Sequence, residues 1–262
     1  MLLANAATVL VLMLGLWLVS LRIGDPSFID AAWGFGFVVI AWVTFALTDT
    51  GPDRRPLLVA VTTVWGLRLA GYLFWRWRRN GPDRRYVAML RRASNPKLFT
   101  LTKVFLLQGA LMFVVSLPVQ LGQIYEHPSG LGVAQYTGLA LAVLGIASES
   151  IADLQLVRFK ADPANNGAVL DRGLWRYTRH PNYFGDFCTW WGLFLISLSA
   201  AVTLVGVVGP LVMSFLLMRW SGVGPLESHL RRRKPGYEAY VRRTSGFFPR
   251  PPRKPEILEV TS

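Results

Sequence analysis

Long apolar segments separated by short polar ones constrain this chain more than any other feature. Residues 2–21 contain no charged side chain and have about the ~20 residues that a helix needs to cross a bilayer. Hydrophobic residues make up 52% of the chain and its mean hydropathy is +0.36, both higher than in an ordinary soluble domain. The sequence therefore predicts an all-α, polytopic membrane protein.

Seven segments are predicted to be transmembrane helices within a single integral membrane domain over residues 1–262. The first is predicted to be retained, because it lacks the basic n-region and the cleavage site of a secretory signal and because more spans follow it. The predicted spans cover residues 2–21, 28–47, 57–75, 99–121, 131–157, 184–198 and 202–220.

The basic residues gather in a few of the connecting segments, and the formal net charge is +13. With seven spans, residues 76–97, residues 158–180 and the tail after Trp220 all lie on one side of the membrane. Since cytoplasmic loops are enriched in Lys and Arg, we predict an external N-terminus and a cytoplasmic C-terminus. The positive charge then has a membrane explanation, which argues against nucleic acid as a partner. Arg54 and Arg55 are the exception to the pattern.

The single cysteine, Cys188, lies within an apolar run. It excludes an intramolecular disulfide and a thiolate metal cluster, so we predict no metal site.

Ionisable residues inside apolar spans are costly, and each is a functional candidate by default. Asp30 lies near the start of the second span and Arg68 lies within the third, and an ion pair between the two would explain both equally well. Asp25 is more simply explained as the N-cap of the second helix. Glu149 and Asp153 are four residues apart, so they share a helix face next to a basic loop and suggest a polar network.

One polar and aromatic stretch leads directly into an apolar helix: residues 173–186, Gly-Leu-Trp-Arg-Tyr-Thr-Arg-His-Pro-Asn-Tyr-Phe-Gly-Asp. Arg172, Arg176 and Arg179 are able to bind phosphate or carboxylate in a bidentate way. Asn182 and Asp186 share one face of the helix that begins at Pro181, whose N-terminus favours an anion.

The aromatic residues of this stretch, among them Tyr177 and Tyr183, offer faces for a nucleotide base. An interfacial loop whose arginines bind lipid headgroups and whose aromatics form a membrane belt explains the stretch about equally well. The tail over residues 221–262 carries Glu227, His229, a basic run and two tyrosines. It is either an anionic-lipid anchor or part of the same site.

The motif at 173–186 resembles the steroid 5-alpha-reductase family of membrane proteins, in its bacterial DUF1295 branch. The likeness extends to residues 25–34 (Asp-Pro-Ser-Phe-Ile-Asp-Ala-Ala-Trp-Gly), 65–68, 152–155, 190–192 and 235–243, and so covers most of the chain. The resemblance implies a seven-helix fold, an NADPH site on the cytoplasmic side, and a lipid-like enone substrate that enters from the bilayer.

The resemblance also implies roles for single residues. Asn182, Tyr183 and Asp186 would contact the nicotinamide or ribose of NADPH. Arg172, Arg176 and Arg179 would contact its phosphates. The rest of the implied cofactor pocket consists of Glu149, Asp153, Arg158, Tyr177, His180, His229, Tyr237 and Tyr240.

The implied reaction is hydride transfer to an electron-poor C=C bond, with an acid pair that polarises the substrate carbonyl. In the steroid reductases that pair is a glutamate on the second span and a tyrosine on the third. Here Asp25 and Asp30 fall near the first position, and Arg68 or Tyr72 near the second. Arg68 stays charged, so it would stabilise an enolate electrostatically and would not donate a proton.

Two other functions are kept open. The Arg-His-Pro-x-Tyr core, with Glu227 before a basic and Tyr-rich tail, also resembles the membrane isoprenylcysteine carboxyl methyltransferases, which use S-adenosylmethionine. Asn182 and Asp186 favour the reductases, because membrane sterol reductases share the Pro-Asn-Tyr-x-Gly-Asp form. The third possibility is a non-enzymatic protein that binds membrane lipids through its basic loops. The sequence indicates no oligomeric state.

Overall fold

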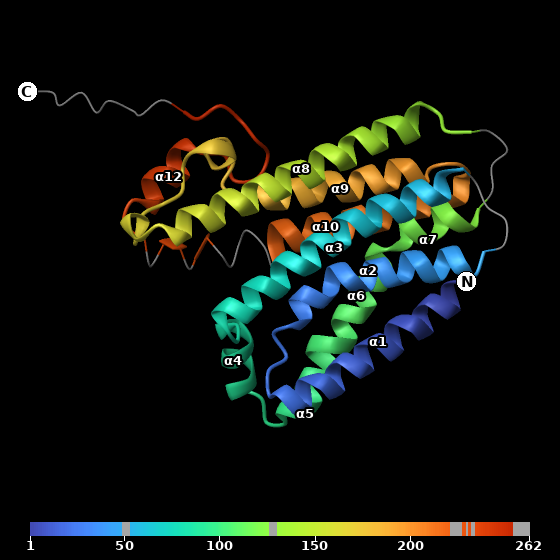
Figure 1. Cartoon of the computed structure of the whole chain (residues 1–262), viewed down its shortest axis with the longest axis horizontal. Helices are drawn as coiled ribbons and strands as arrows, with labels where there is room; N and C mark the ends of the chain where they lie inside the picture. Colours follow the sequence, from blue (N-terminus) through green and yellow to red (C-terminus); the bar gives the residue numbers. More distant parts are fainter. Residues whose placement is uncertain (49–52, 126–129, 221–226, 229, 232–233, 254–262) are drawn as a thin grey trace, which may run out of the picture. The chain divides into compact units, whose positions relative to one another are not determined.

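The computed structural model describes residues 1–48, 53–125, 130–220, 227–228, 230–231 and 234–253. This part of the chain is helical and contains no strand (Figure 1). It divides into two compact units, the first built from residues 1–140 and 191–212 and the second from residues 141–190 and 213–262. The all-α class predicted from the sequence is confirmed.

The first unit begins with α1 (Leu2–Ile23), α2 (Ile29–Ala46) and α3 (Arg54–Asn80). The short α4 (Arg84–Arg91) and α5 (Pro96–Phe99) follow, and the chain then continues through η1 (Thr100–Leu106), α6 (Leu107–Val115) and α7 (Leu117–Ile124).

The remaining elements are α8 (Val133–Ala161), η2 (Pro163–Asn165), η3 (Gly173–Arg176), α9 (Pro181–Ser197), η4 (Ala201–Val207), α10 (Val208–Phe215), η5 (Leu216–Trp220) and α12 (Tyr237–Arg243). Helices α8, α9 and α10 contribute residues to both units.

Six helical segments are long and apolar enough to cross a membrane: Leu2–Ile23, Ile29–Ala46, Arg54–Asn80, Pro96–Val115, Val133–Ala161 and Ala201–Arg219. Each overlaps a predicted span. The other predicted span, residues 184–198, corresponds to α9, which has 17 residues and lies at the lower limit of the length that crosses a bilayer. The protein therefore has the helices of an integral membrane protein, with six candidate spans among its described residues.

The helix of the fourth predicted span is interrupted in the structure. Its helix runs to Val115, and after Ser116 a new helix, α7, begins with Pro118 in its first turn. Proline has no backbone N–H to continue the helical hydrogen bonds, so it is accommodated best at a helix start. The predicted span over residues 99–121 therefore contains a helix break at Ser116.

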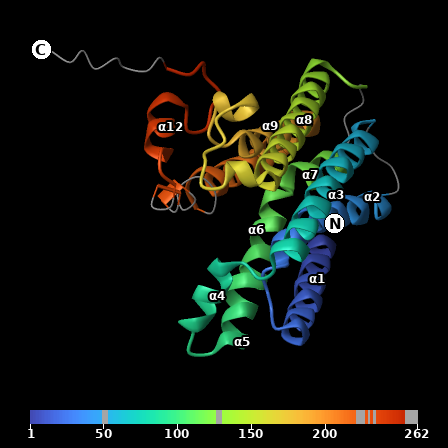
Figure 2. The same ribbon diagram turned by 60° about the vertical axis from the view of Figure 1, so that its left-hand side comes forward.

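Backbone-to-backbone contact joins α2 and α3, which lie side by side in Figures 1 and 2. A Cβ atom added at Gly66 would lie 2.5 Å from the carbonyl oxygen of Gly34, and one added at Gly34 would collide with the carbonyl of Gly66. Small residues that let helices approach closely are typical of membrane helix pairs.

Arg54 and Arg55 are buried, and both bind helix ends. Arg54 Nε donates to the carbonyl of Gly122 at 2.9 Å, and Arg55 Nη2 donates to the carbonyls of Phe45 and Thr48 at 2.6 Å each. The last carbonyls of a helix lack intrahelical partners, and a cation there also favours the helix dipole. The two arginines outside the predicted charge pattern thus have a structural role at the ends of α7 and α2.

Candidate functional site

The residues predicted from the sequence fall into two groups, one in each unit. Asp25, Asp30, Arg68 and Tyr72, the candidates for substrate polarisation, belong to the first unit. The candidates for cofactor binding that the structure describes belong to the second unit, over residues 149–186 and 237–240. His229 lies outside the described residues.

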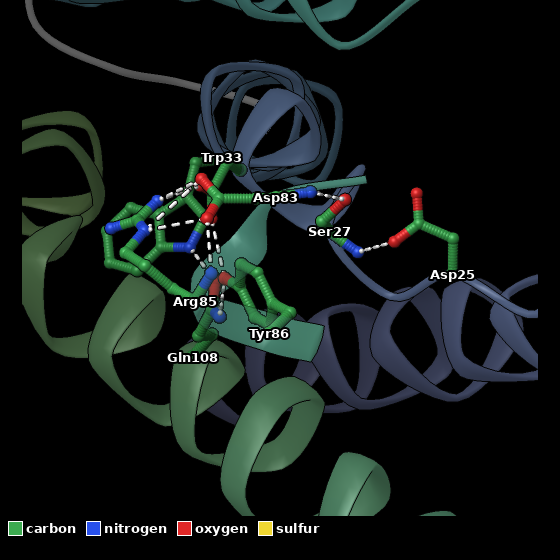
Figure 3. A network of polar contacts seen from close by, with 8 residues as sticks. Asp25, Ser27, Trp33, Asp83, Arg85, Tyr86 and Gln108 are labelled. Carbon is green, nitrogen blue, oxygen red and sulfur yellow. Dashed lines mark hydrogen bonds and ion pairs between the residues drawn. The ribbon is translucent and has the colours of Figure 1, made fainter. Parts of the chain in front are cut away.

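Asp30 lies in the first turn of α2 and binds two residues of α4. The hydroxyl of Tyr86 donates to Asp30 Oδ1 at 2.7 Å, and Arg85 Nη2 donates to Asp30 Oδ2 at 3.0 Å. Gln108 Nε2 donates to the hydroxyl of Tyr86 at 3.2 Å, and Gln108 Oε1 accepts a hydrogen bond from the indole of Trp33. Figure 3 shows Trp33, Tyr86 and Gln108, from three segments of the first unit, close to one another.

A second set of contacts fixes the loop before α4. Asp83 is the N-cap of α4, since its carboxylate accepts from the backbone of Arg85 at 2.8 Å, and it also pairs with the Arg85 guanidinium at 3.0 Å. The backbone N–H of Asp83 donates to Ser27 Oγ at 3.1 Å (Figure 3). We define the Asp30 network as Asp30, Asp83, Arg85, Tyr86 and Gln108.

Asp25 has a different structural role from the predicted one. Helix α2 begins at Ile29 with Phe28 at its N-cap, so Asp25 is not the cap of that helix. Its carboxylate accepts from the backbone N–H of Ser27 and from the indole of Trp77, both at 2.8 Å. Asp25 therefore closes a local turn, as short acidic side chains often do by accepting from a nearby backbone N–H. Its bond to Trp77 also ties this turn to the end of α3.

Burial and charge set the protonation of this network. Burial, followed by the neighbouring Asp30 carboxylate, raises the pKa of Tyr86 far above its ordinary value. Burial alone would raise the pKa of Asp83 too, but the hydrogen bonds from Arg85 outweigh it and the pKa is lowered. At neutral pH Tyr86 is thus a protonated phenol that donates its hydrogen bond, and Asp83 is an anion.

Arg68 and Tyr72 lie one turn apart on α3, and both are partly buried. The Tyr72 ring stacks on Trp75 with centroids 6.2 Å apart, and the guanidinium of Arg76 lies 6.0 Å from its centre. Such rings and cations are typical of a membrane–water interface.

In the second unit, the acidic candidates lie where α8 and α9 approach most closely. Glu149, Asp153 and Asp186 are all buried, and Asn182 Nδ2 donates to Asp153 Oδ1 at 3.2 Å. The close approach depends on Gly145 and Gly185, because a Cβ on either would lie 2.5 Å from the carbonyl oxygen of the other. The polar network predicted for Glu149 and Asp153 thus includes a contact to the predicted motif.

The Arg-His pair of the motif is held by Glu227. Arg179 donates to both carboxylate oxygens of Glu227, at 2.8 and 3.1 Å, and His180 Nε2 lies 3.0 Å from the same carboxylate. The Arg179 and Glu227 side chains are only 11% and 12% exposed. We call these three residues the Glu227 clamp. Burial alone would raise the pKa of Glu227, but the hydrogen bonds from His180 and Arg179 lower it to about 2.

The same arginine binds the end of α12. Arg179 Nη1 donates to the carbonyls of Thr244 and Val241 at 2.5 and 3.2 Å, and the backbone N–H of Arg179 donates to the carbonyl of Ser245 at 2.9 Å. The hydroxyl of Tyr240 reaches the carbonyl of Trp175 at 2.5 Å. The tail therefore joins the motif loop through side-chain and backbone bonds, and Arg179 already holds several protein acceptors.

Three other arginines of the predicted cofactor site are exposed: Arg158, Arg172 and Arg176. The guanidinium of Arg172 lies 5.9 Å from the centre of the Phe159 ring. Tyr177 is 45% exposed, whereas Tyr237 and Tyr240 are buried against each other with ring centroids 5.8 Å apart. The loop thus presents cations and an aromatic face outward while its other half is fixed inside the unit.

The sequence reasoning missed Tyr86 and Gln108. Tyr86 is 7% exposed although it lies in a basic connecting segment. Its signal is the apolar spacing in Arg84-Arg-Tyr-Val-Ala-Met-Leu-Arg, where Tyr86 and Leu90 share one helix face. Within the described residues, no group of three His, Cys, Asp or Glu side chains is arranged to hold a metal ion.

Comparisons with known proteins agree with the motifs at the family level. The model of the DUF1295 family, described as a protein of unknown function, matches residues 16–244. The chain belongs to this family. It is also similar to an uncharacterized protein of Schizosaccharomyces pombe, with 24% identity over 271 aligned positions that cover 90% of this chain and 76% of that protein. No solved structure matches the chain significantly.

Proposed function

We propose that this protein is an NADPH-dependent membrane reductase that transfers a hydride to an activated C=C bond of a lipid-like or steroid-like enone. The observation that carries the proposal is the hydrogen bond of 2.7 Å from the Tyr86 hydroxyl to Asp30. The phenol stays protonated at neutral pH and so has an O–H to offer to a carbonyl oxygen, whereas methyl transfer to a carboxylate has no need of such a donor. A relation to the steroid 5-alpha-reductases is part of this proposal.

Tyr86 would act on the oxygen of the substrate. NADPH would supply the hydride for the β carbon, and negative charge would then grow on the carbonyl oxygen. Tyr86 would turn its O–H from Asp30 to this oxygen and stabilise the enolate, as an oxyanion site does, and a proton from water would then add to the α carbon. Arg85 stays paired with Asp30 at 3.0 Å, which keeps the Asp30 carboxylate compensated when the phenol turns away.

The second unit offers suitable residues for NADPH. Arg172 and Arg176 expose guanidinium groups, which prefer phosphate oxygens, and Arg158 is exposed as well. Asn182, next to Asp153, remains our candidate for a contact to the nicotinamide or ribose, together with Tyr183 and Asp186. Since Arg179 is held by Glu227, we assign the phosphates to Arg172 and Arg176.

Titration of the purified protein with NADPH and with S-adenosylmethionine tests the proposal. We expect NADPH to bind, and Asn182→Ala to abolish that binding in a protein that still folds and loses only about 1 kcal/mol of stability with its hydrogen bond to Asp153. The double substitution Arg172→Gln/Arg176→Gln is expected to weaken NADPH binding by about 30–150-fold if each charged contact contributes about 1–1.5 kcal/mol. Tight binding of the methyl donor without NADPH binding would overturn the proposal.

The Glu227 clamp favours a second candidate. A glutamate that joins the Arg-His-Pro motif to a Tyr-rich tail is the feature shared with isoprenylcysteine carboxyl methyltransferases, and Glu227 binds both Arg179 and His180 here. This candidate predicts binding of S-adenosylmethionine that is lost with the clamp and is insensitive to Tyr86→Phe. If the protein binds neither ligand, and its membrane binding depends only on the number of basic residues, it is a non-enzymatic lipid-binding protein.

We also propose that α9 is a seventh span, with the N-terminus outside and the C-terminus in the cytoplasm. Two short apolar elements in succession, α9 and the segment Ala201–Arg219, then form a hairpin, and the basic segments 76–97, 158–180 and the tail share one side. A C-terminal green fluorescent protein fusion is expected to fluoresce. A periplasmic alkaline phosphatase signal from the same position would contradict the cytoplasmic C-terminus.

A further inference from the structure

Helix α4 has two faces of opposite character. Tyr86 is buried and binds Asp30, so this face fixes the helix to α2. Arg84, Val87, Ala88, Arg91 and Arg92 recur every third or fourth residue, which places them together on another face. All five are exposed, and they line a surface groove of about 440 Å³.

The three arginines of this groove are not used by the protein itself. Arg84, Arg91 and Arg92 take part in no ion pair among the described residues, whereas Arg85, one position along, pairs with Asp83 and Asp30. Val87 and Ala88 lie between these cations, and Val87 is 37% exposed. The groove therefore combines an uncompensated positive charge with a small apolar floor.

The position of α4 in the chain identifies its surroundings. Helix α3 and the segment Pro96–Val115 are both candidate membrane spans, and only residues 81–95 connect them. Figures 1 and 2 show α4 at the end of α3, next to α5. A short helix between two spans lies near the headgroup layer, where arginines keep their charge in water while apolar atoms face the acyl chains.

We propose that this face of α4 is a binding site for the phosphate headgroup of an anionic phospholipid. The guanidinium groups of Arg84, Arg91 and Arg92 would bind the headgroup oxygens, and Val87 and Ala88 would contact the first methylenes of the acyl chains. The groove volume lies within the range of small-ligand sites. The proposal does not depend on the reductase function, since no residue of the groove has a role there.

A photoactivatable phosphatidylglycerol in nanodiscs tests the site. The full chain is labelled at increasing fractions of this lipid, and the adducts are assigned to peptides by mass spectrometry. We expect labelling of the α4 peptide to be much stronger than with the phosphatidylcholine analogue. With about 1 kcal/mol per arginine, Arg84→Gln/Arg91→Gln/Arg92→Gln should weaken the apparent affinity on the order of 100-fold, which lowers labelling to the phosphatidylcholine level.

The control is Arg242→Gln/Arg250→Gln/Arg253→Gln, which removes the same charge from exposed arginines of the second unit. It should leave labelling of the α4 peptide unchanged. Glutamine forms helices about as well as arginine, so both variants should unfold at the wild-type temperature in detergent. Equal loss in the control, unchanged labelling in the α4 variant, or full competition by excess inorganic phosphate would overturn the proposal of a lipid site.

Discussion

Two acid–arginine ion pairs in this protein differ in their exposure to solvent. In the Glu227 clamp, Arg179 and Glu227 are 11% and 12% exposed, and the arginine also holds two carbonyls at the end of α12. In the Asp30 network, Arg85 is 53% exposed and Asp30 is 28% exposed, and a phenol shares the carboxylate. A carboxylate–guanidinium pair is thus nearly buried in the second unit, whereas the pair in the first unit is partly open to solvent.

The difference separates a structural pair from an adjustable one. A desolvated charge that loses its partner remains buried and costs several kcal/mol, so the clamp cannot open without destabilising its unit. A pair that water reaches costs little to rearrange. The ion pair of the Asp30 network is therefore able to rearrange, whereas the Glu227 clamp holds the motif loop and the tail in place.

The largest effect is expected from Glu227→Ala. It leaves the Arg179 cation nearly buried without its carboxylate, which should destabilise the second unit by about 3–5 kcal/mol. Thermal unfolding in detergent measures the loss. The matched control is Glu238→Ala, which breaks the exposed pair with Arg231 and should cost about 0.2–1 kcal/mol. Similar losses in the two variants would show that the clamp is no more structural than a surface pair.

Tyr86→Phe should have a large effect on the reaction and a small one on stability. The substitution removes the hydroxyl that we propose as the hydrogen-bond donor to the enolate oxygen, so kcat should fall about 100- to 10,000-fold. The lost hydrogen bond to Asp30 should cost about 1 kcal/mol of stability. Steady-state rates with an enone substrate measure the first effect, and Tyr136→Phe, at a 60% exposed residue, is the control. An unchanged kcat would remove Tyr86 from the mechanism.

The stability that the Glu227 clamp contributes should depend on pH. The pKa of Glu227 is lowered from 4.5 to about 2 in the folded protein, so its contribution to stability is present above the unfolded pKa near 4.5. The contribution decreases as the pH falls from about 4.5 toward 2, by about 3 kcal/mol in total. Unfolding temperatures of the wild type and Glu227→Gln should converge over this range. A constant difference between them would contradict the lowered pKa.

The sequence predicted most of the helices and only part of the site. Uncharged runs such as residues 2–21 are sufficient for a span, because a bilayer leaves the backbone few alternatives to a helix. Glu227 and Arg179 are far apart in the chain, and no local pattern indicates that they form an ion pair. The same holds for Tyr86, which a basic loop contributes to the first turn of α2. The roles of residues whose partners are distant in the sequence could be identified only from the structure.

The smallest effect is expected from Arg85→Gln, and it is the sharpest test of the contrast between the two pairs. Because Arg85 is 53% exposed, its loss should cost only about 0.2–1 kcal/mol of stability. In the proposed mechanism, Arg85 compensates Asp30 when Tyr86 turns to the substrate, so this variant should lower kcat about 10-fold while the unfolding temperature scarcely changes. Arg231→Gln, in the exposed pair with Glu238, should change neither. If Arg85→Gln instead destabilises the protein as strongly as Glu227→Ala, the Asp30 network is a structural clamp like the other.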